Sequence, residues 1–159
     1  MRTVIVCGLL AAILVGCASG TVTPLSEATV EGPKIVALDA PRAPWVVEIE
    51  SRLRKEGFKV LRWASTSRVR EQTSETKSEE FRRSEARYVL VVDGYAPLDP
   101  MNRCFGGGYR FSSLTAELVD TRNNETVVSV SGSGYSEGCP PLSGTIFADV
   151  TKAVVSAWK

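Results

Sequence analysis

The chain contains four cysteines and no histidine, which limits the chemistry that its side chains can perform. Without an imidazole, a catalytic serine or cysteine lacks its usual base, and zinc lacks its commonest ligand. Cys7 and Cys17 lie near the amino terminus, whereas Cys104 and Cys139 lie in the second half of the chain. The first pair belongs to a segment that has the layout of a targeting signal, and the second pair is a candidate disulfide.

The amino-terminal segment, 1–16, has the layout of a secretory signal. Arg2 supplies a positive charge, an apolar run from Val4 to Val15 follows, and small residues precede Cys17. The apolar run is too short for a stable membrane span, so export is the better interpretation.

The four residues Leu14-Val15-Gly16-Cys17 resemble the lipobox of bacterial lipoproteins. The resemblance implies that the chain is cut before Cys17, whose sulfur is diacylated and whose new amine is acylated, palmitate being a typical chain. Ala18 stands where the family's inner-membrane retention signal would place an aspartate. The resemblance therefore implies a lipid anchor on the periplasmic face of the outer membrane.

Composition narrows the possible partners of the mature chain. Removal of Arg2 with the signal would lower the lysine and arginine count from 19 to 18, against 18 acidic residues. A neutral chain lacks the basic surface of a nucleic-acid-binding protein. The Ser-, Thr-, Gly- and Pro-containing segment 17–32 is expected to be a flexible tether, and 33–159 a single domain.

Cys104 and Cys139 remain as an even pair once the amino-terminal cysteines are accounted for. In an oxidising periplasm they are expected to form a disulfide. A metal site and a reactive nucleophile are the competing interpretations. The chain has no histidine, which is the commonest zinc ligand and the usual partner of a catalytic cysteine. We therefore expect no metal and no cofactor.

Hydrophobic periodicity predicts the secondary structure. Strands are expected at 34–38, 58–63, 88–92, 110–120 and 126–135. A helix between Asp39 and Gly57 would join the first two strands as a parallel crossover, and a helix after an N-cap at Ser143 would close the chain. The polar segment 65–85 is expected to be a solvated helix or loop, with a charged partner-binding arm as the alternative.

These elements predict an α/β (α+β) fold with one mixed sheet of about five strands and both helices mainly on one face. The pattern resembles small outer-membrane lipoprotein domains similar to the amino-terminal domain of TolB. That group includes the curli-secretion lipoprotein and an outer-membrane activator of penicillin-binding proteins. The resemblance rests on the lipobox, on the strand at 34–38 with the helix and Gly57-Phe58-Lys59-Val60 behind it, on Ala86-Arg87-Tyr88-Val89-Leu90-Val91-Val92, and on the hairpin and the closing helix. It implies no catalytic residues.

The leading functional hypothesis is a non-enzymatic lipoprotein that docks onto an envelope protein partner in cell-wall synthesis, secretion or assembly. Aromatic residues beside a rigid disulfide make good anchors, so we expect Phe105, Tyr109 and Tyr135 to form the partner-binding surface. One alternative is a periplasmic binder of a small glycan or lipid, with the glycines at 106–108 as a lid. An enzyme using two carboxylates such as Asp93 and Asp99 is the other alternative.

Overall fold

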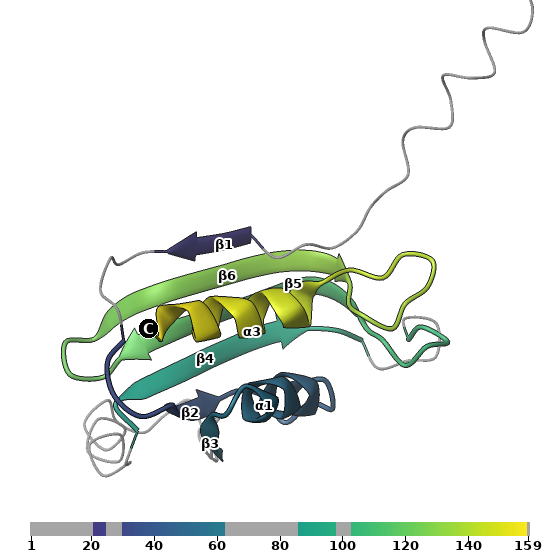
Figure 1. The fold of residues 1–159 in the computed structure, drawn as a ribbon. Helices are drawn as coiled ribbons and strands as arrows, with labels where there is room; N and C mark the ends of the chain where they lie inside the picture. Colours follow the sequence, from purple (N-terminus) through teal and green to yellow (C-terminus); the bar gives the residue numbers. More distant parts are fainter. Residues whose placement is uncertain (1–20, 25–29, 63–85, 98–102, 159) are drawn as a thin grey trace, which may run out of the picture.

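The computed structural model describes residues 21–24, 30–62, 86–97 and 103–158. The helices and strands are β1 (Thr21–Pro24), β2 (Ile35–Asp39), α1 (Val46–Lys55), β3 (Lys59–Arg62), β4 (Tyr88–Tyr95), β5 (Arg110–Asp120), β6 (Glu125–Tyr135) and α3 (Ile146–Ala157). In this part of the chain, six strands form one mixed sheet in the order β1-β6-β5-β4-β2-β3 (Figure 1). The predicted α+β fold with a single mixed sheet is confirmed.

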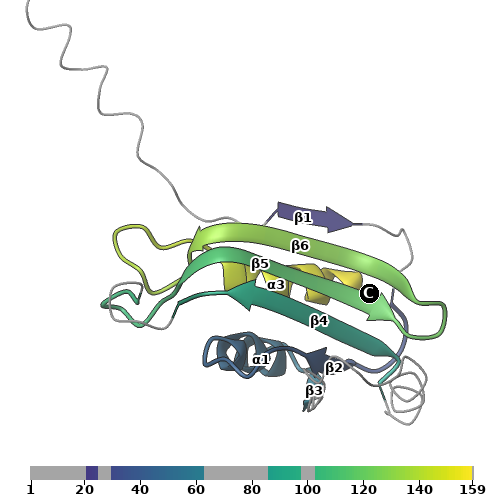
Figure 2. The same ribbon diagram turned by 180° about the vertical axis from the view of Figure 1, so that it is seen from behind.

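The sheet combines a parallel and an antiparallel half. β2 pairs in parallel with β3 on one side and with β4 on the other, as expected for strands joined by crossover connections. β4, β5, β6 and β1 then pair antiparallel in turn. Both helices lie on one face, and the view from behind shows the sheet in front of α3 (Figure 2). The predicted one-sided helical cover is therefore present.

Buried and exposed residues alternate along β5 and so give the two faces of the sheet different compositions. Leu114, Ala116 and Leu118 are buried on the helical face, whereas Thr115 and Glu117 are exposed on the other face. A period of two residues places successive side chains on opposite faces of a strand. The second face is consequently hydroxyl-rich and polar along β5.

Aromatic rings join the helices to the sheet. Trp45, at the start of α1, meets Phe111 of β5 edge to face with 5.3 Å between ring centroids, and Phe111 meets Phe147 of α3 at 5.8 Å. At the other end of α3, Trp158 packs against Phe58 and Tyr88 at 4.9 and 5.1 Å. Edge-to-face pairs of this kind add about 0.5–1.5 kcal/mol each beyond the burial of area.

Helix α1 covers the parallel half of the sheet, with Val46, Ile49 and Leu53 buried. The N-cap position is Trp45, whose side chain makes no capping bond. On the outer side, Arg54 binds the Glu50 carboxylate at 2.9 Å. The same guanidinium donates to the Val60 carbonyl of β3 at 3.0 Å and so ties the helix to that strand.

The amino-terminal segment departs from the predicted tether. Thr21–Pro24 forms β1, which pairs with β6 and extends the expected five strands to six. Further on, Val30 is buried, and its N–H donates a hydrogen bond to the Ala157 carbonyl at 2.8 Å. Val30 also forms an isolated parallel β-bridge with Trp158. The expectation of a flexible 17–32 is wrong for these two segments, because backbone pairing with β6 and α3 fixes residues whose own pattern carries no period.

Several sequence predictions lie outside the described residues. They are the signal 1–16, the lipidation of Cys17, the parts 17–20 and 25–29 of the expected tether, and the polar connection 65–85. In the part of the chain that the structure describes, no helix is long and apolar enough to cross a membrane.

Candidate docking site at the disulfide loops

Two loops meet at one end of the sheet and are joined by the predicted disulfide between Cys104 and Cys139. The first loop leads into β5, and the second follows β6, so the hairpin brings them side by side. Backbone hydrogen bonds support the covalent link: Gly108 donates to Gly138 at 3.1 Å, and Ser136 donates to Tyr109 at 2.8 Å. The disulfide prediction is confirmed.

Gly106 and Gly108 are explained by the closeness of these two loops, and Gly107 by its φ of +84°. A Cβ atom on Gly106 would lie 2.5 Å from the Gly138 carbonyl oxygen. One on Gly108 would lie 2.5 Å from the Cys139 Sγ atom and from the Glu137 carbonyl oxygen. Only glycine permits backbones to approach this closely. The loop is fixed by packing, which argues against its expected alternative role as a movable lid.

The three aromatic residues expected at the partner surface have different environments. The Phe105 side chain is fully exposed at the loop, and Tyr135 is partly exposed beside Arg110. Tyr109 is only 8% exposed, and its ring lies under the Arg103 guanidinium at 4.8 Å. Tyr109 is therefore a support for the loop, and its expected role as a surface anchor is wrong.

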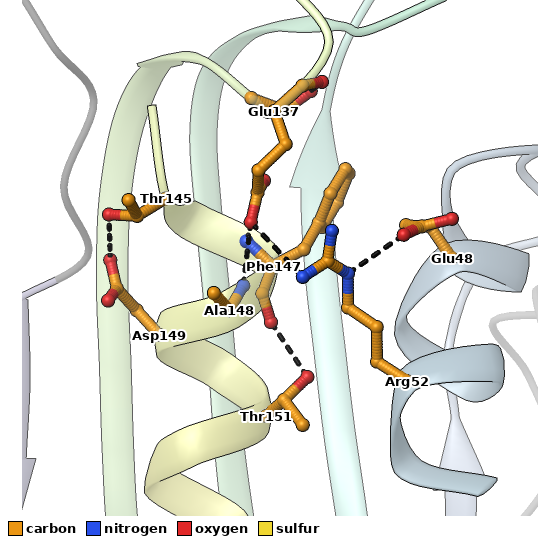
Figure 3. A network of polar contacts seen from close by, with 9 residues as sticks. Glu48, Arg52, Glu137, Thr145, Phe147, Ala148, Asp149 and Thr151 are labelled. Carbon is orange, nitrogen blue, oxygen red and sulfur yellow. Dashed lines mark hydrogen bonds and ion pairs between the residues drawn. The ribbon is translucent and has the colours of Figure 1, made fainter. Parts of the chain in front are cut away.

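Glu137 is a structural residue of this site that sequence reasoning missed. Its carboxylate accepts hydrogen bonds from the backbone N–H groups of Phe147 and Ala148, at 3.2 and 2.8 Å, and so caps the N-terminus of α3 (Figure 3). A carboxylate at this position satisfies free amides and complements the helix dipole. Arg52 of α1 approaches the same carboxylate at 3.6 Å.

Ser143, the N-cap predicted from the sequence, has a different role. Helix α3 begins at Ile146 with Thr145 as N-cap, and Ser143 Oγ instead accepts a hydrogen bond from the Cys139 N–H at 2.8 Å. The predicted cap is wrong because the capping carboxylate comes from ten residues before Phe147. Together, Ser143 and Glu137 fasten the second loop on both sides of Cys139.

The opposite end of the sheet is closed by an ion pair between Arg87 and Asp120. Arg87 Nε donates to both carboxylate oxygens, at 3.1 and 2.9 Å, and Nη2 donates to one of them as well. Burial alone would raise the pKa of the Asp120 carboxyl, but the bonds from Arg87 and from the Arg122 N–H, with the charges of both arginines, outweigh burial and hold that pKa below its usual range.

The described residues include only one of the two carboxylates considered for catalysis. Asp93 is exposed on β4 and accepts a hydrogen bond from the Gly94 N–H at 2.8 Å, while Asp99 lies outside the described residues. Among the residues that the structure places, no group of three or more His, Cys, Asp or Glu side chains could hold a metal ion.

A groove of about 530 Å³ lies between α1 and α3. Arg52, Lys55 and Lys152 line it together with Glu48 and Glu56, so its walls carry both signs of charge. Arg52 is engaged with Glu48 at 2.8 Å. The groove fits the small-ligand alternative in its size and its charged walls.

Comparison with known proteins identifies the fold. No family model and no curated protein sequence matches the chain. The solved dodecamer of PelC from Paraburkholderia phytofirmans is similar, with 23% identity, a TM-score of 0.50, and coverage of 88% of this chain and 98% of that one. A solved dodecamer of a leucine-to-methionine variant of the same PelC gives 22% identity and a TM-score of 0.51 with the same coverage.

A third solved structure is more distant. TolB from Acinetobacter baumannii shows 11% identity and a TM-score of 0.46, and the match covers 88% of this chain but 31% of that protein. At these identities the likeness concerns the arrangement of the chain alone. The protein described here thus shares with PelC a fold that spans nearly the whole of that protein.

Proposed function

We propose that the protein is a lipid-anchored, non-enzymatic docking module on the periplasmic face of the outer membrane, where it binds an envelope protein partner. The lipobox ending in Cys17 supports the anchor and the compartment. The disulfide between Cys104 and Cys139 fits an oxidising compartment. The absence of histidine from the sequence underlies the choice of a binding function over catalysis.

The observation that carries the docking function is the exposure of Phe105 on a loop that cannot relax. A large apolar side chain in water is unfavourable, and a mobile loop would bury it. Here the disulfide and the close packing of Gly106 and Gly108 prevent that movement. A rigid aromatic side chain binds a partner at little conformational cost, as binding hot spots do.

A cross-linking pulldown from cells tests this function. Phe105→Ser should reduce recovery of the partner by about tenfold or more, the loss expected when a hot-spot side chain is removed. The matched variant Tyr95→Ser, which removes another exposed aromatic ring on β4, should leave recovery unchanged. Equal recovery from both variants would refute docking through Phe105. Intact-mass analysis of native protein beside Cys17→Ser tests the anchor separately, since only the native chain should carry acyl mass.

Self-association is a further part of the proposal. The solved PelC structures are dodecamers, and this chain shares their fold over 88% of its length. We therefore expect the purified protein to form a closed homo-oligomer, which native mass spectrometry would detect. If the purified protein were a monomer at all concentrations tested, it would share the fold of PelC but not its assembly.

The small-ligand alternative rests on the groove between α1 and α3. Its volume of about 530 Å³ lies within the range of small-molecule sites. Lys55 and Lys152 provide one cation from each helix for an acidic glycan fragment. Thermal stabilisation by cell-wall fragments, abolished in Lys55→Gln/Lys152→Gln but retained in Phe105→Ser, would favour this alternative over protein docking.

A further inference from the structure

The two sulfur atoms of the disulfide differ in their access to solvent. Cys139 is 2% exposed, whereas Cys104 is part-exposed on the first loop. The Cys139 Sγ atom lies 3.7 Å from the Tyr109 carbonyl oxygen, and so close to Gly108 that a Cβ atom there would come within 2.5 Å of it. A thiolate that opens a disulfide must reach the sulfur that it attacks. Cys104 Sγ is therefore the sulfur that a thiolate can reach.

The second loop is held in place by bonds that do not involve the disulfide. The Cys139 N–H donates to Ser143 Oγ at 2.8 Å. The Gly144 N–H donates to the Tyr135 carbonyl at 3.1 Å. The Glu137 carboxylate, bonded to the N-terminus of α3, fastens the same loop to that helix. Breakage of the disulfide should therefore leave this loop and its cysteine where they are.

The first loop depends more on the disulfide. Within this loop, the Gly107 N–H donates to the Cys104 carbonyl at 2.9 Å, and the Cys104 N–H donates to the Gly108 carbonyl at 3.2 Å. Gly108 itself donates to Gly138 of the second loop. In the part of the chain that the structure describes, the disulfide is thus the bond that ties 104–107 across to the second loop.

From these differences we propose that Cys104 is a thiolation site, at which a small anionic thiol opens the disulfide. The incoming thiolate attacks Cys104 Sγ, the bond between the two cysteine sulfurs breaks, and a new disulfide joins the thiol to Cys104. The incoming sulfur is oxidised, while the Cys139 sulfur is reduced and leaves as a thiolate. Because a buried charge is unfavourable, this thiolate takes a proton from water, and its S–H can then donate to the Tyr109 carbonyl.

Charge and space favour a small anionic thiol as the reactant. Arg103 and Arg110 are both exposed, and the segment 103–110 carries no carboxylate. A cationic surface attracts a thiolate. Cys104 is only part-exposed, and the neighbouring Gly106 packs against the second loop, which leaves more room for a small molecule than for the active site of a protein reductase. Glutathione, a tripeptide of net negative charge, has the required size and charge.

Thiolation of Cys104 releases the loop that carries Phe105. Once 104–107 is no longer tied across, the exposed ring can turn against the protein's own surface and lose the rigidity that favours binding. This consequence rests on the proposed docking function, whereas the thiolation site does not. The thiol content of the compartment would thus control docking.

Reaction of two variants with oxidised glutathione tests the site. Cys139→Ser leaves the Cys104 thiol free, and Cys104→Ser leaves the Cys139 thiol free. We expect Cys104 to form its mixed disulfide at least about tenfold faster than Cys139 in the folded variants. In urea the two rates should be equal, which controls for the intrinsic reactivity of the two thiols. Equal rates in the folded variants would overturn the proposed site.

The native protein gives a second measurement that needs no substitution. After incubation with reduced glutathione, acid quenching and alkylation, peptide mass analysis should find glutathione on Cys104 and the alkyl group on Cys139. The reverse pattern, or no adduct, would contradict the proposal. A disulfide reductase that lacks its resolving cysteine provides the comparison with a protein thiol. Faster reaction of that reductase than of glutathione would refute the choice of a small thiol.

The glutathione adduct separates the site from its consequence for docking. Amide hydrogen exchange at Gly107 should rise by about tenfold or more, while exchange at Cys139, whose N–H is bonded to Ser143, stays unchanged. Equal acceleration in both loops would contradict the one-sided release. If the first loop is released but the adduct recovers as much partner as the native protein does, docking through Phe105 is refuted and the thiolation site is retained.

Discussion

The two ends of the sheet are closed by different kinds of interaction. At one end, a covalent bond between Cys104 and Cys139 and close backbone packing hold two loops together. At the other, the charge-assisted hydrogen bonds of Arg87 and Asp120 tie the start of β4 to the end of β5. The disulfide can be broken by reduction, whereas the ion pair is lost when the Asp120 carboxylate is protonated. The exposed side chain of Phe105 lies at the end that the disulfide joins.

The largest effect should come from opening the covalent end. Cys104→Ser with Cys139→Ser removes a link across 35 residues, and the chain-entropy relation gives a loss of about 4 kcal/mol. Chemical denaturation of the native and double-serine proteins at pH 7 measures it. A loss below about 1 kcal/mol, far under that relation, would show that backbone packing alone closes this end.

A smaller effect is expected from Gly108→Ala. The added methyl group meets Cys139 Sγ and the Glu137 carbonyl at 2.5 Å, and overpacking of this kind costs about 1–3 kcal/mol. Gly32→Ala, where a Cβ would meet nothing within 4 Å, controls for the general effect of the extra methyl group, although its φ of +107° adds backbone strain. Gly108 is not among the positive-φ glycines, so a loss in Gly108→Ala reports the contact; no measurable loss would show that the two loops move apart to admit the methyl group.

At the ionic end, Asp120→Asn should destabilise the protein by about 1–2 kcal/mol at pH 7, a value reduced for the partial exposure of Arg87. The native pKa of Asp120 is lowered, so the stability from its ionised form is present above the unfolded pKa of about 3.9 and is lost as pH falls through the folded value. Urea unfolding at pH 7, 5 and 3 should show the two proteins converging at acid pH. A gap that stays constant would contradict the ion-pair account.

The smallest effect is predicted for Glu137→Gln, which keeps a hydrogen-bond acceptor but removes the charge at the start of α3. We expect a loss of about 0.5–1 kcal/mol. Amide hydrogen exchange at Phe147 and Ala148 should accelerate in this variant. Unchanged exchange there would mean that Glu137 does not cap the helix in solution.

Local patterns in the sequence were sufficient for much of the fold. Val46, Ile49 and Leu53 indicated the helix by their spacing, and the alternation from Leu114 to Leu118 indicated the strand. The disulfide followed from cysteine count and compartment, without geometry. The pattern that predicts the helix or the strand lies within that one element, and the pattern that predicts the disulfide lies in the composition. A single sequence is therefore enough to predict all three.

The remainder depends on contacts between distant segments. β1 has no period of its own and exists through pairing with β6, so its sequence suggested a tether. Glu137 caps a helix that begins nine residues later, where no N-cap rule would search. Tyr109 follows the glycines 106–108 and was expected at the surface, but its ring packs into the core near Phe111.

The bond from Arg54 to the Val60 carbonyl also bears on how the chain avoids aggregation. An edge strand with free carbonyls is a template for strands of other molecules. Arg54 occupies one such carbonyl on β3, and at the other edge β1 ends in Pro24, which has no N–H to offer. Copies of this protein are thus discouraged from joining sheet to sheet, and an ordered assembly would be built from side-chain surfaces instead.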